Sequence, residues 1–285
     1  FIEEILRSFI DEGVVEKKNG NYVVSGDLKS IVIPSTIQEL LITRIDRLDE
    51  SSKSLLKTAS VIGRNFFYKI LVKVGSEIPN IDIKLQVLKD AQLIIEDKRL
   101  GEIEYQFKHA LIQETVYESI LHQNRKKIHY RVAVSTREIF KNRLNEFYGM
   151  LAYHYSSAED LVEAANFLKK AGEEALKSSA SSEAINYYME AFNLYKIQTG
   201  QAANPEEVAA FEKNIAVALY NKGQHEEAVE YFDNALNYYW RSLPKSSLAV
   251  LFSLISAFLH LLISLYLPSF KFKRSPTEKD VEIAD

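Results

Sequence analysis

The chain has 285 residues, no cysteine, 47% hydrophobic and 26% charged residues, and a formal net charge of −4 at pH 7. This length can bury two or more cores, and the lack of cysteine excludes disulfides, thiolate nucleophiles and cysteine-based zinc sites. The near-neutral charge gives no general reason to expect nucleic acid, and the few glycines (10) and prolines (6) favour helices.

The first third of the chain predicts short helices and one early hairpin. Residues 2–12 carry apolar side chains at helical spacing and end at Gly13. A turn-rich stretch, "KKNGNYVVSGDLKS", predicts a short hairpin. Ser35 and Gln38 then have the spacing of a capping box, which predicts the start of a helix.

The next stretch predicts several helices followed by two strands. A helix with Leu55, Leu56 and Ile62 on its apolar face ends at Gly63. The pattern then changes to alternation in "LIIED" and "IEYQF", which predicts a hairpin. The other helices are expected at 66–74, 81–92 and 108–121. Several helices followed by a hairpin are typical of a winged-helix domain.

Residues 145–240 predict an all-helical array that repeats. Small residues and aromatics recur at the spacing of tetratricopeptide repeats, where the small residues allow helices to approach closely. Two of the matches share the helix at 161–178, so the phase of the repeats stays open. The expected packing residues are Tyr148, Leu151, Ala152, Tyr155, Ala164, Leu168, Ala171, Gly172, Ala184, Tyr188, Ala191, Ala228, Phe232 and Ala235.

An uncharged segment, "LAVLFSLISAFLHLLISLYL", follows the array at 248–267. Twenty uncharged residues are long enough to span a bilayer. The segment directly follows a helical array and ends at Pro268, so we expect a helix buried in the longer protein rather than a membrane span. Its neighbours would lie downstream, and we therefore expect exposed apolar surface in this chain.

The sequence holds no constellation that indicates catalysis or metal binding. No pair of glycines has the spacing of a phosphate-binding loop, and no Gly-Lys-Ser/Thr occurs. The histidines are scattered, and the adjacent acidic pairs do not share a helix face. We therefore expect no catalytic residue, no metal ligand and no cofactor bound by this chain alone.

Two stretches raise the question of nucleic acid. The helix at 81–92 would be the recognition helix of a winged-helix domain, but its lysines are balanced by aspartates. The run at 125–143 is more basic, and most such runs are exposed helix faces. Residues 156–240 hold 14 Asp and Glu against 6 Lys and Arg, a net charge of −8. We expect no nucleic acid; the acidic array suits a basic partner or serves solubility.

Three segments together resemble one family: "IPSTIQELLITRIDRL", "LLKTASVIGRNFF" and "YQFKHALIQETVYESILHQNRKKIH". They resemble the region after the ATPase core in STAND-class signalling ATPases, most closely those linked to class III adenylate or guanylate cyclases of the soluble adenylyl cyclase type. In that family a core with a lid helix comes first, then a winged helix, then tetratricopeptide-like repeats. The resemblance implies that ATP or ADP with Mg is bound by a core outside this chain, and related ATPases also drive kinases and transcription factors.

The same resemblance gives His109 a role. In related switch ATPases, including plant disease-resistance proteins, a winged-helix histidine in a Met-His-Asp-Leu segment contacts the β-phosphate of ADP. "FKHAL" resembles that segment, with Ala110 in place of the acid. The resemblance implies that His109 senses the nucleotide state; the alternative is that it caps the helix or bonds a backbone carbonyl.

We expect a mainly α chain: a winged-helix domain with a small hairpin, followed by a tetratricopeptide-like solenoid. Because it starts without methionine and has no closing signal, we interpret it as an internal fragment. The expected parts are the end of the lid region and a linker (1–33), the winged helix (34–122), a connecting helix (123–144), the repeats (145–240), and the apolar helix with the start of a further repeat (241–285).

The function predicted from these parts is a non-catalytic, cytoplasmic regulatory and scaffolding region of a signalling ATPase, with a cyclase as its expected output. It would couple nucleotide state to output and bind proteins, or other domains of the parent chain, through its repeats. The alternatives are a free-standing tetratricopeptide interaction module and, less favoured by charge, a winged-helix transcription regulator.

Overall fold

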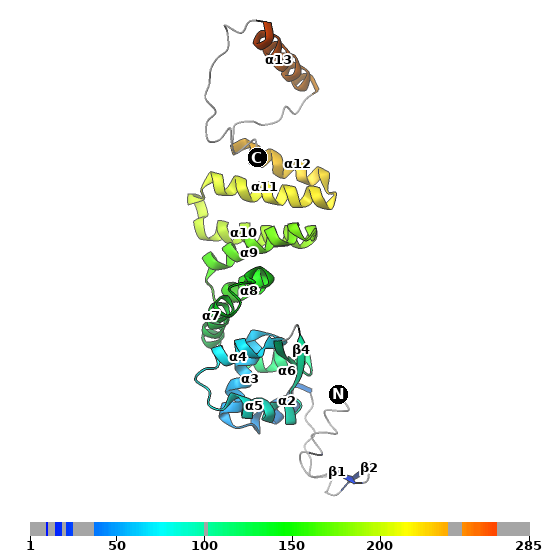
Figure 1. Cartoon of the computed structure of the whole chain (residues 1–285), viewed down its shortest axis with the longest axis vertical. Helices are drawn as coiled ribbons and strands as arrows, with labels where there is room; N and C mark the ends of the chain where they lie inside the picture. The colour runs from blue at the N-terminus through cyan, green and yellow to red at the C-terminus, as the bar shows by residue number, and fades with distance from the viewer. Residues whose placement is uncertain are drawn as a thin grey trace. The chain divides into compact units, whose positions relative to one another are not determined.

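A computed structural model describes residue 10 and residues 15–18, 21–24, 37–99, 102–238 and 247–266 (Figure 1). The chain divides into two compact units, Phe1–Phe167 and Leu168–Asp285. Apart from Ile10, which is helical, the predicted helix at 2–12 lies outside the described residues, as do Ser35 and the side chain of Gln38. The predicted domain limits stay predictions.

The early hairpin forms as predicted. Strand β1, Val15–Lys18, pairs antiparallel with β2, Asn21–Val24. Val15 lies opposite Val24, and Lys18 lies opposite Asn21.

Two helices open the sheet-bearing part of the first unit: α2, Ile37–Asp46, and α3, Glu50–Ile62. Helix α3 begins where the Asp49 carboxylate accepts hydrogen bonds from the amides of Ser51 and Ser52, and it ends at Gly63 with a φ of 145°. Leu55 and Leu56 of α3 are fully buried, so this helix lies at the centre of the core.

A three-stranded antiparallel sheet closes this core. It has the order β3–β5–β4, formed by Asn65–Phe67 (β3), Glu102–Phe107 (β5) and Ile94–Arg99 (β4). Helices α4, Tyr68–Val74, and α5, Ile81–Asp90, lie between β3 and β4 in sequence. The order of helices followed by a hairpin agrees with the predicted order, apart from the added strand β3.

One prediction in this stretch is wrong. The helix expected at 66–74 begins at Tyr68, because Asn65–Phe67 pair with β5 as a third strand. Helical spacing of apolar residues in 66–74 hid this strand. Phe66 is buried and stacks on Tyr105 of β5 at 5.8 Å between ring centroids, so its burial depends on a strand nearly forty residues later.

Long helices follow the sheet. Helix α6, Ala110–Glu118, is shorter than expected, and α7, His122–Ile139, begins near the start of the expected connecting helix (123–144) and ends before it does. A 3-10 helix, Leu144–Phe147, leads into α8, Tyr148–Ser157, and α9, Leu161–Lys177. The rings of Phe140 and Phe147 stack at 4.3 Å and hold this connection in place.

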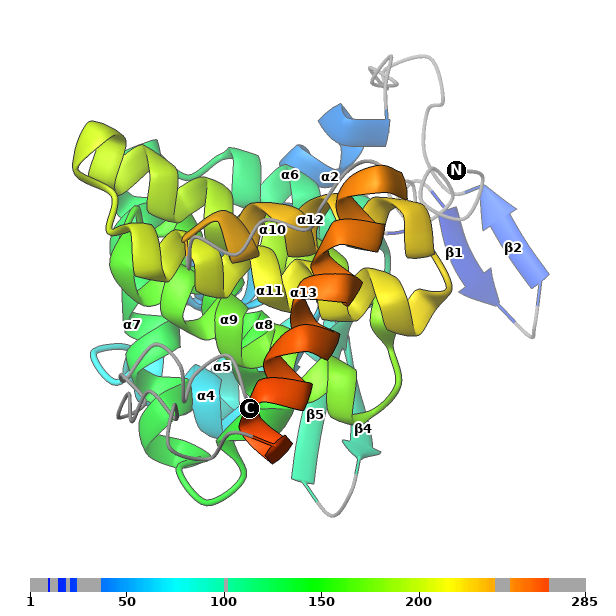
Figure 2. The same ribbon diagram turned by 90° about the horizontal axis from the view of Figure 1, so that it is seen from above.

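The second unit continues the array with α10, Ser181–Thr199, α11, Pro205–Lys222, and α12, His225–Tyr238. Helices α10, α11 and α12 lie side by side in both views (Figures 1 and 2). Asn204 caps α11 at its start, and Gly223 ends it with a φ of 87° in the left-handed region. Together with the small sheet, these helices confirm the predicted mainly α fold class.

Most of the expected packing residues are buried. Tyr148 and Phe232 are half-buried, and the remainder are buried: Leu151, Ala152, Tyr155, Ala164, Leu168, Ala171, Gly172, Ala184, Tyr188, Ala191, Ala228 and Ala235. At one crossing the fit is very tight, because a methyl group built on Gly172 of α9 would lie 2.8 Å from the ring of Tyr188 of α10. The glycine therefore allows this close approach of the two helices.

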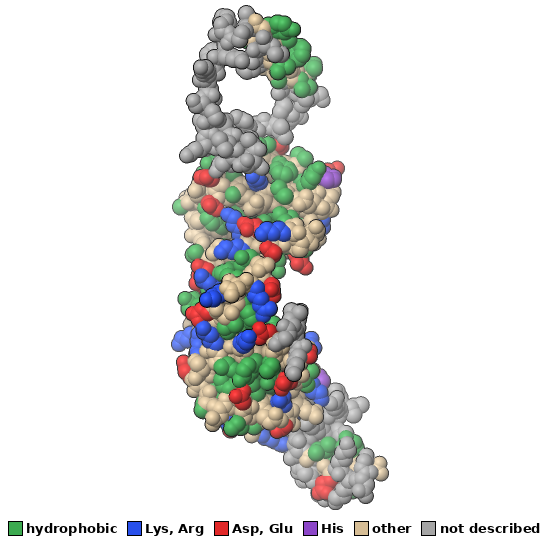
Figure 3. All heavy atoms as spheres, in the orientation of Figure 1, with side chains coloured by type: hydrophobic (Ala, Val, Ile, Leu, Met, Phe, Trp, Pro, Cys, Tyr) green, Lys and Arg blue, Asp and Glu red, His purple; other side chains and the backbone are tan. Residues whose placement is uncertain are grey.

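The apolar segment forms α13, Ser247–Tyr266. Its described large side chains are exposed except for the half-buried Leu262, with Phe252 at 71% and Leu254 at 63%, and hydrophobic atoms gather on one side of α13 in Figure 3. This matches the expectation of exposed apolar surface in this chain. Over the described residues, no helix has the length and apolar character needed to span a membrane.

Candidate functional site

His109 lies at the junction between β5 and α6. Phe107 is fully buried, Lys108 donates its amide to Leu93 at 3.0 Å, and His109 takes the N-cap position of α6. The His109 carbonyl accepts from the amide of Ile112 at 3.1 Å, but its side chain makes no capping hydrogen bond. Side-chain capping is therefore not what the imidazole does here, and its nucleotide-sensing role stays a prediction.

Helix α5, at the place of a recognition helix, has its two lysines engaged in ion pairs. Lys84 lies 2.9 Å from Asp49, and Lys89 lies 2.7 Å from Glu96. Asp82 accepts a hydrogen bond from the Tyr68 hydroxyl at 2.7 Å. These pairs bind α5 to its own domain, which argues against phosphate contact and favours protein packing.

The basic run in α7 also has structural partners. Arg125 donates to the carbonyls of Ile120 and Glu118, both at 2.7 Å, and so satisfies the end of α6. Arg131 donates to the carbonyl of Val74 at the end of α4, and Lys126 pairs with Glu159. These basic side chains hold neighbouring helices against α7.

A buried polar network, which the sequence did not reveal, crosses the middle of α7. Nδ1 of His129 lies 2.8 Å from Nδ1 of His154 in α8, and both side chains are at most 1% exposed. The Tyr117 hydroxyl of α6 lies 3.1 Å from Nε2 of His129, and His154 also bonds the backbone of Ile62, the last residue of α3. The network therefore joins α3, α6, α7 and α8.

The hydrogen bonds of this network fix its direction. The Ile62 carbonyl can only accept, so the His154 nitrogen facing it donates, and Nδ1 of a neutral His154 accepts from Nδ1–H of His129. His129 Nε2 then accepts from Tyr117. We call this chain of hydrogen bonds, Tyr117–His129–His154–Ile62, the histidine relay.

Burial keeps both imidazoles neutral. It lowers the pKa of His129 to about 4, helped by the nearby charge of Arg125, and it lowers the pKa of His154 to about 3, helped by His129. In two neutral rings the donor of one can face the acceptor of the other, so the pair is suited to a structural hydrogen bond between α7 and α8. Within the described residues, no group of three or more His, Cys, Asp or Glu side chains is placed to hold a metal ion.

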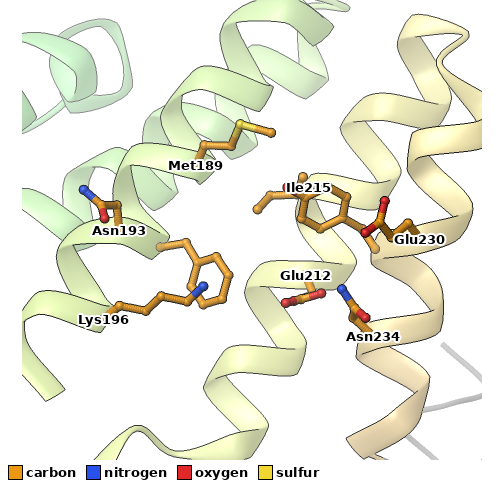
Figure 4. Close-up of a pocket in the computed structure, with 9 residues that line it drawn as sticks. Met189, Asn193, Lys196, Glu212, Ile215, Glu230 and Asn234 are labelled. Carbon is orange, nitrogen blue, oxygen red and sulfur yellow. The ribbon is translucent and has the colours of Figure 1, made fainter. Parts of the chain in front are cut away.

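A pocket of about 390 Å³ opens among α10, α11 and α12 in the second unit (Figure 4). Phe192 and Ile215 form its buried base, and Met189 and Tyr231 belong to its walls. Lys196, Glu212 and Glu230 bring charges, and Asn193 and Asn234 bring amides. Sequence reasoning missed this pocket, because its residues come from three helices whose relative placement no repeat pattern fixes.

Comparisons with known proteins give partial matches. No protein-family model matches the chain. Over 154 residues it is 27% identical to the peroxide stress-activated histidine kinase mak3 of Schizosaccharomyces pombe, a match covering 51% of this chain and 6% of the kinase. The chain thus spans a small part of that relative's length.

Among solved structures, a Signal Transduction ATPase with Numerous Domains (STAND) protein with a tetratricopeptide repeat sensor, PH0952 from Pyrococcus horikoshii, matches at 16% identity. The match covers 73% of this chain and 47% of that one, with a TM-score of 0.29. That score is too low to establish a shared fold.

Proposed function

We propose that this chain is a regulatory and scaffolding region of a cytoplasmic STAND-class signalling ATPase. Its winged-helix part would report the nucleotide state of an ATPase core that binds ATP or ADP with Mg, and its helical array would bind protein partners. The chain itself would carry no catalytic residue. The similarity to part of a stress-activated histidine kinase supports a signalling parent.

The histidine relay carries this proposal. Helix α6 has His109, the candidate sensor, at its N-cap, and it holds Tyr117 seven residues after its first residue, Ala110. Tyr117 bonds His129 in α7, and His129 bonds His154 in α8, the first helix of the array. A shift of α6 caused by nucleotide at His109 would disturb buried hydrogen bonds that α8 needs, which couples the two parts physically.

The cyclase expected from the sequence has less support. The curated relative is a histidine kinase, so the likeness favours a signalling parent without indicating a cyclase. We therefore propose the regulatory role, and a cyclase output is an expectation from the sequence resemblance alone.

The second candidate is a free-standing tetratricopeptide interaction module, which the close helix packing at Gly172 and Tyr188 favours. It differs from the first in one respect, because it gives His109 no ligand. A transcription regulator is disfavoured by the ion pairs of Lys84 and Lys89.

We expect the isolated chain to bind neither ATP nor ADP appreciably, because it lacks a phosphate-binding loop. Calorimetric titration of this chain and of the full-length protein that carries it measures this. Micromolar affinity for ATP in the isolated chain would contradict the proposal, and lack of nucleotide binding by the full-length protein would favour the interaction module.

A further inference from the structure

The pocket among α10, α11 and α12 combines an apolar base with charged walls. Phe192 is 6% exposed and Ile215 is 1% exposed, so both side chains are packed among their neighbours and form a fixed base of the pocket. Met189, at 39% exposed, lies at the rim. A volume of about 390 Å³ holds one long side chain together with part of a neighbour, and is too small for a helix.

One carboxylate oxygen in this pocket has no partner. Oε2 of Glu212 is buried and makes no hydrogen bond. Figure 4 shows the Glu212 carboxylate beside Asn234, facing the space between α11 and α12. A buried acceptor without a donor is costly, so the site favours a ligand that supplies an N–H group.

The charges of the pocket favour a cation. The ammonium of Lys196 lies 3.7 Å from the centre of the Phe192 ring, so it is engaged with that ring. Glu212 and Glu230 outweigh this one positive charge, which leaves the pocket at −1. Burial raises the pKa of the Tyr231 hydroxyl, and Glu212, Glu230 and Glu227 add to the effect, as expected for a negative potential at the ring.

We propose that this pocket binds an arginine side chain of a partner protein, with an apolar neighbour of that arginine against Met189. The inference rests on the proposed function in taking the array as a partner-binding surface, and it names the chemistry of the partner. The net charge of −8 over residues 156–240 would attract such a basic segment.

Arginine fits better than lysine for geometric reasons. A guanidinium is planar and presents several N–H donors, so it can donate to Glu212 and Glu230 while its face lies against the ring of Tyr231. A lysine ammonium is a compact and strongly hydrated charge, and it would gain less from the aromatic wall.

The test uses the complete chain and a blocked dipeptide, acetyl-arginyl-leucine amide, followed through the NMR signals of the Asn193 and Asn234 side-chain amides. The control ligand carries citrulline, which has nearly the shape of arginine but no charge. We expect the arginine ligand to shift both amide signals and to bind at least about tenfold more tightly than the citrulline ligand. Equal binding of the two ligands would overturn the proposal.

Two variants locate the site. Glu212→Gln keeps the shape of the side chain and removes its charge, so we expect at least a tenfold loss of arginine affinity. Glu190→Gln, an exposed position on α10, should leave the affinity unchanged. If the arginine ligand still binds Glu212→Gln with wild-type affinity, or if its binding shifts neither asparagine amide signal, this pocket is not the arginine site. Neither result bears on nucleotide binding by the full-length protein or on partner binding elsewhere on the array, so the proposed function would still stand.

Discussion

His154→Leu is expected to lower the free energy of unfolding by about 2–5 kcal/mol, because it leaves two buried groups without partners. These groups are Nδ1–H of His129 and the carbonyl of Ile62, both bonded to His154 in the relay. Urea unfolding of the wild type and the variant measures the loss. His122→Leu, at the exposed start of α7, serves as the control and should change stability by no more than about 0.5 kcal/mol.

The double variant His129→Leu/His154→Leu separates the relay from simple loss of volume. Removing both rings leaves fewer orphaned groups, and the Tyr117 hydroxyl keeps a hydrogen bond with Tyr153. The double variant should therefore lose less stability than the sum of the two single variants. Additive losses would show that the two rings do not act together.

The pH dependence of stability gives the same pair a second signature. Both imidazoles stay neutral in the folded state, with pKa values near 4 and 3 against an ordinary value of 6.5, whereas the unfolded chain takes up protons below pH 6.5. The contribution of the pair is complete above pH 6.5 and falls as the pH drops toward 4, by about 1.4 kcal/mol per pH unit for each histidine. The double variant should lack this extra slope between pH 6.5 and 4.

Ala184→Leu is expected to cost about 1–3 kcal/mol by overpacking. Ala184 is fully buried in α10, and the same helix carries Tyr188, whose ring already leaves no room for a methyl group at Gly172. Ser182→Leu adds the same side chain at an exposed position of α10 and should leave the thermal midpoint nearly unchanged. An unchanged midpoint for Ala184→Leu would show that this crossing is not as tight as the structure describes.

Local patterns predicted the elements whose partners are close in sequence. The hairpin at 15–24, helix α3 with its end at Gly63, and strands β4 and β5 each follow from spacing and turn residues. Strand β3 was missed because its three residues are held by pairing with β5, and no local signal reports a partner that far away.

The site residues also show that sequence patterns do not reveal contacts between distant segments. His109 stood out because it falls where a strand gives way to a helix, and the structure places it at the N-cap of α6. His154 did not, since its partner His129 lies 25 residues earlier and neither forms a recognisable motif with the other. The orphaned oxygen of Glu212 depends on three helices packing together, which a list of acidic residues cannot show.

The central claim is that this region reports the nucleotide state of its parent ATPase, and ADP release from the full-length protein tests it most directly. Release of a fluorescent ADP analogue should be about tenfold faster with His109→Ala than in the wild type, because the proposed charge-assisted hydrogen bond from His109 to phosphate would be lost. The control His122→Ala should release ADP at the wild-type rate. Equal release rates for His109→Ala and the wild type would contradict the account and leave the chain as an interaction module.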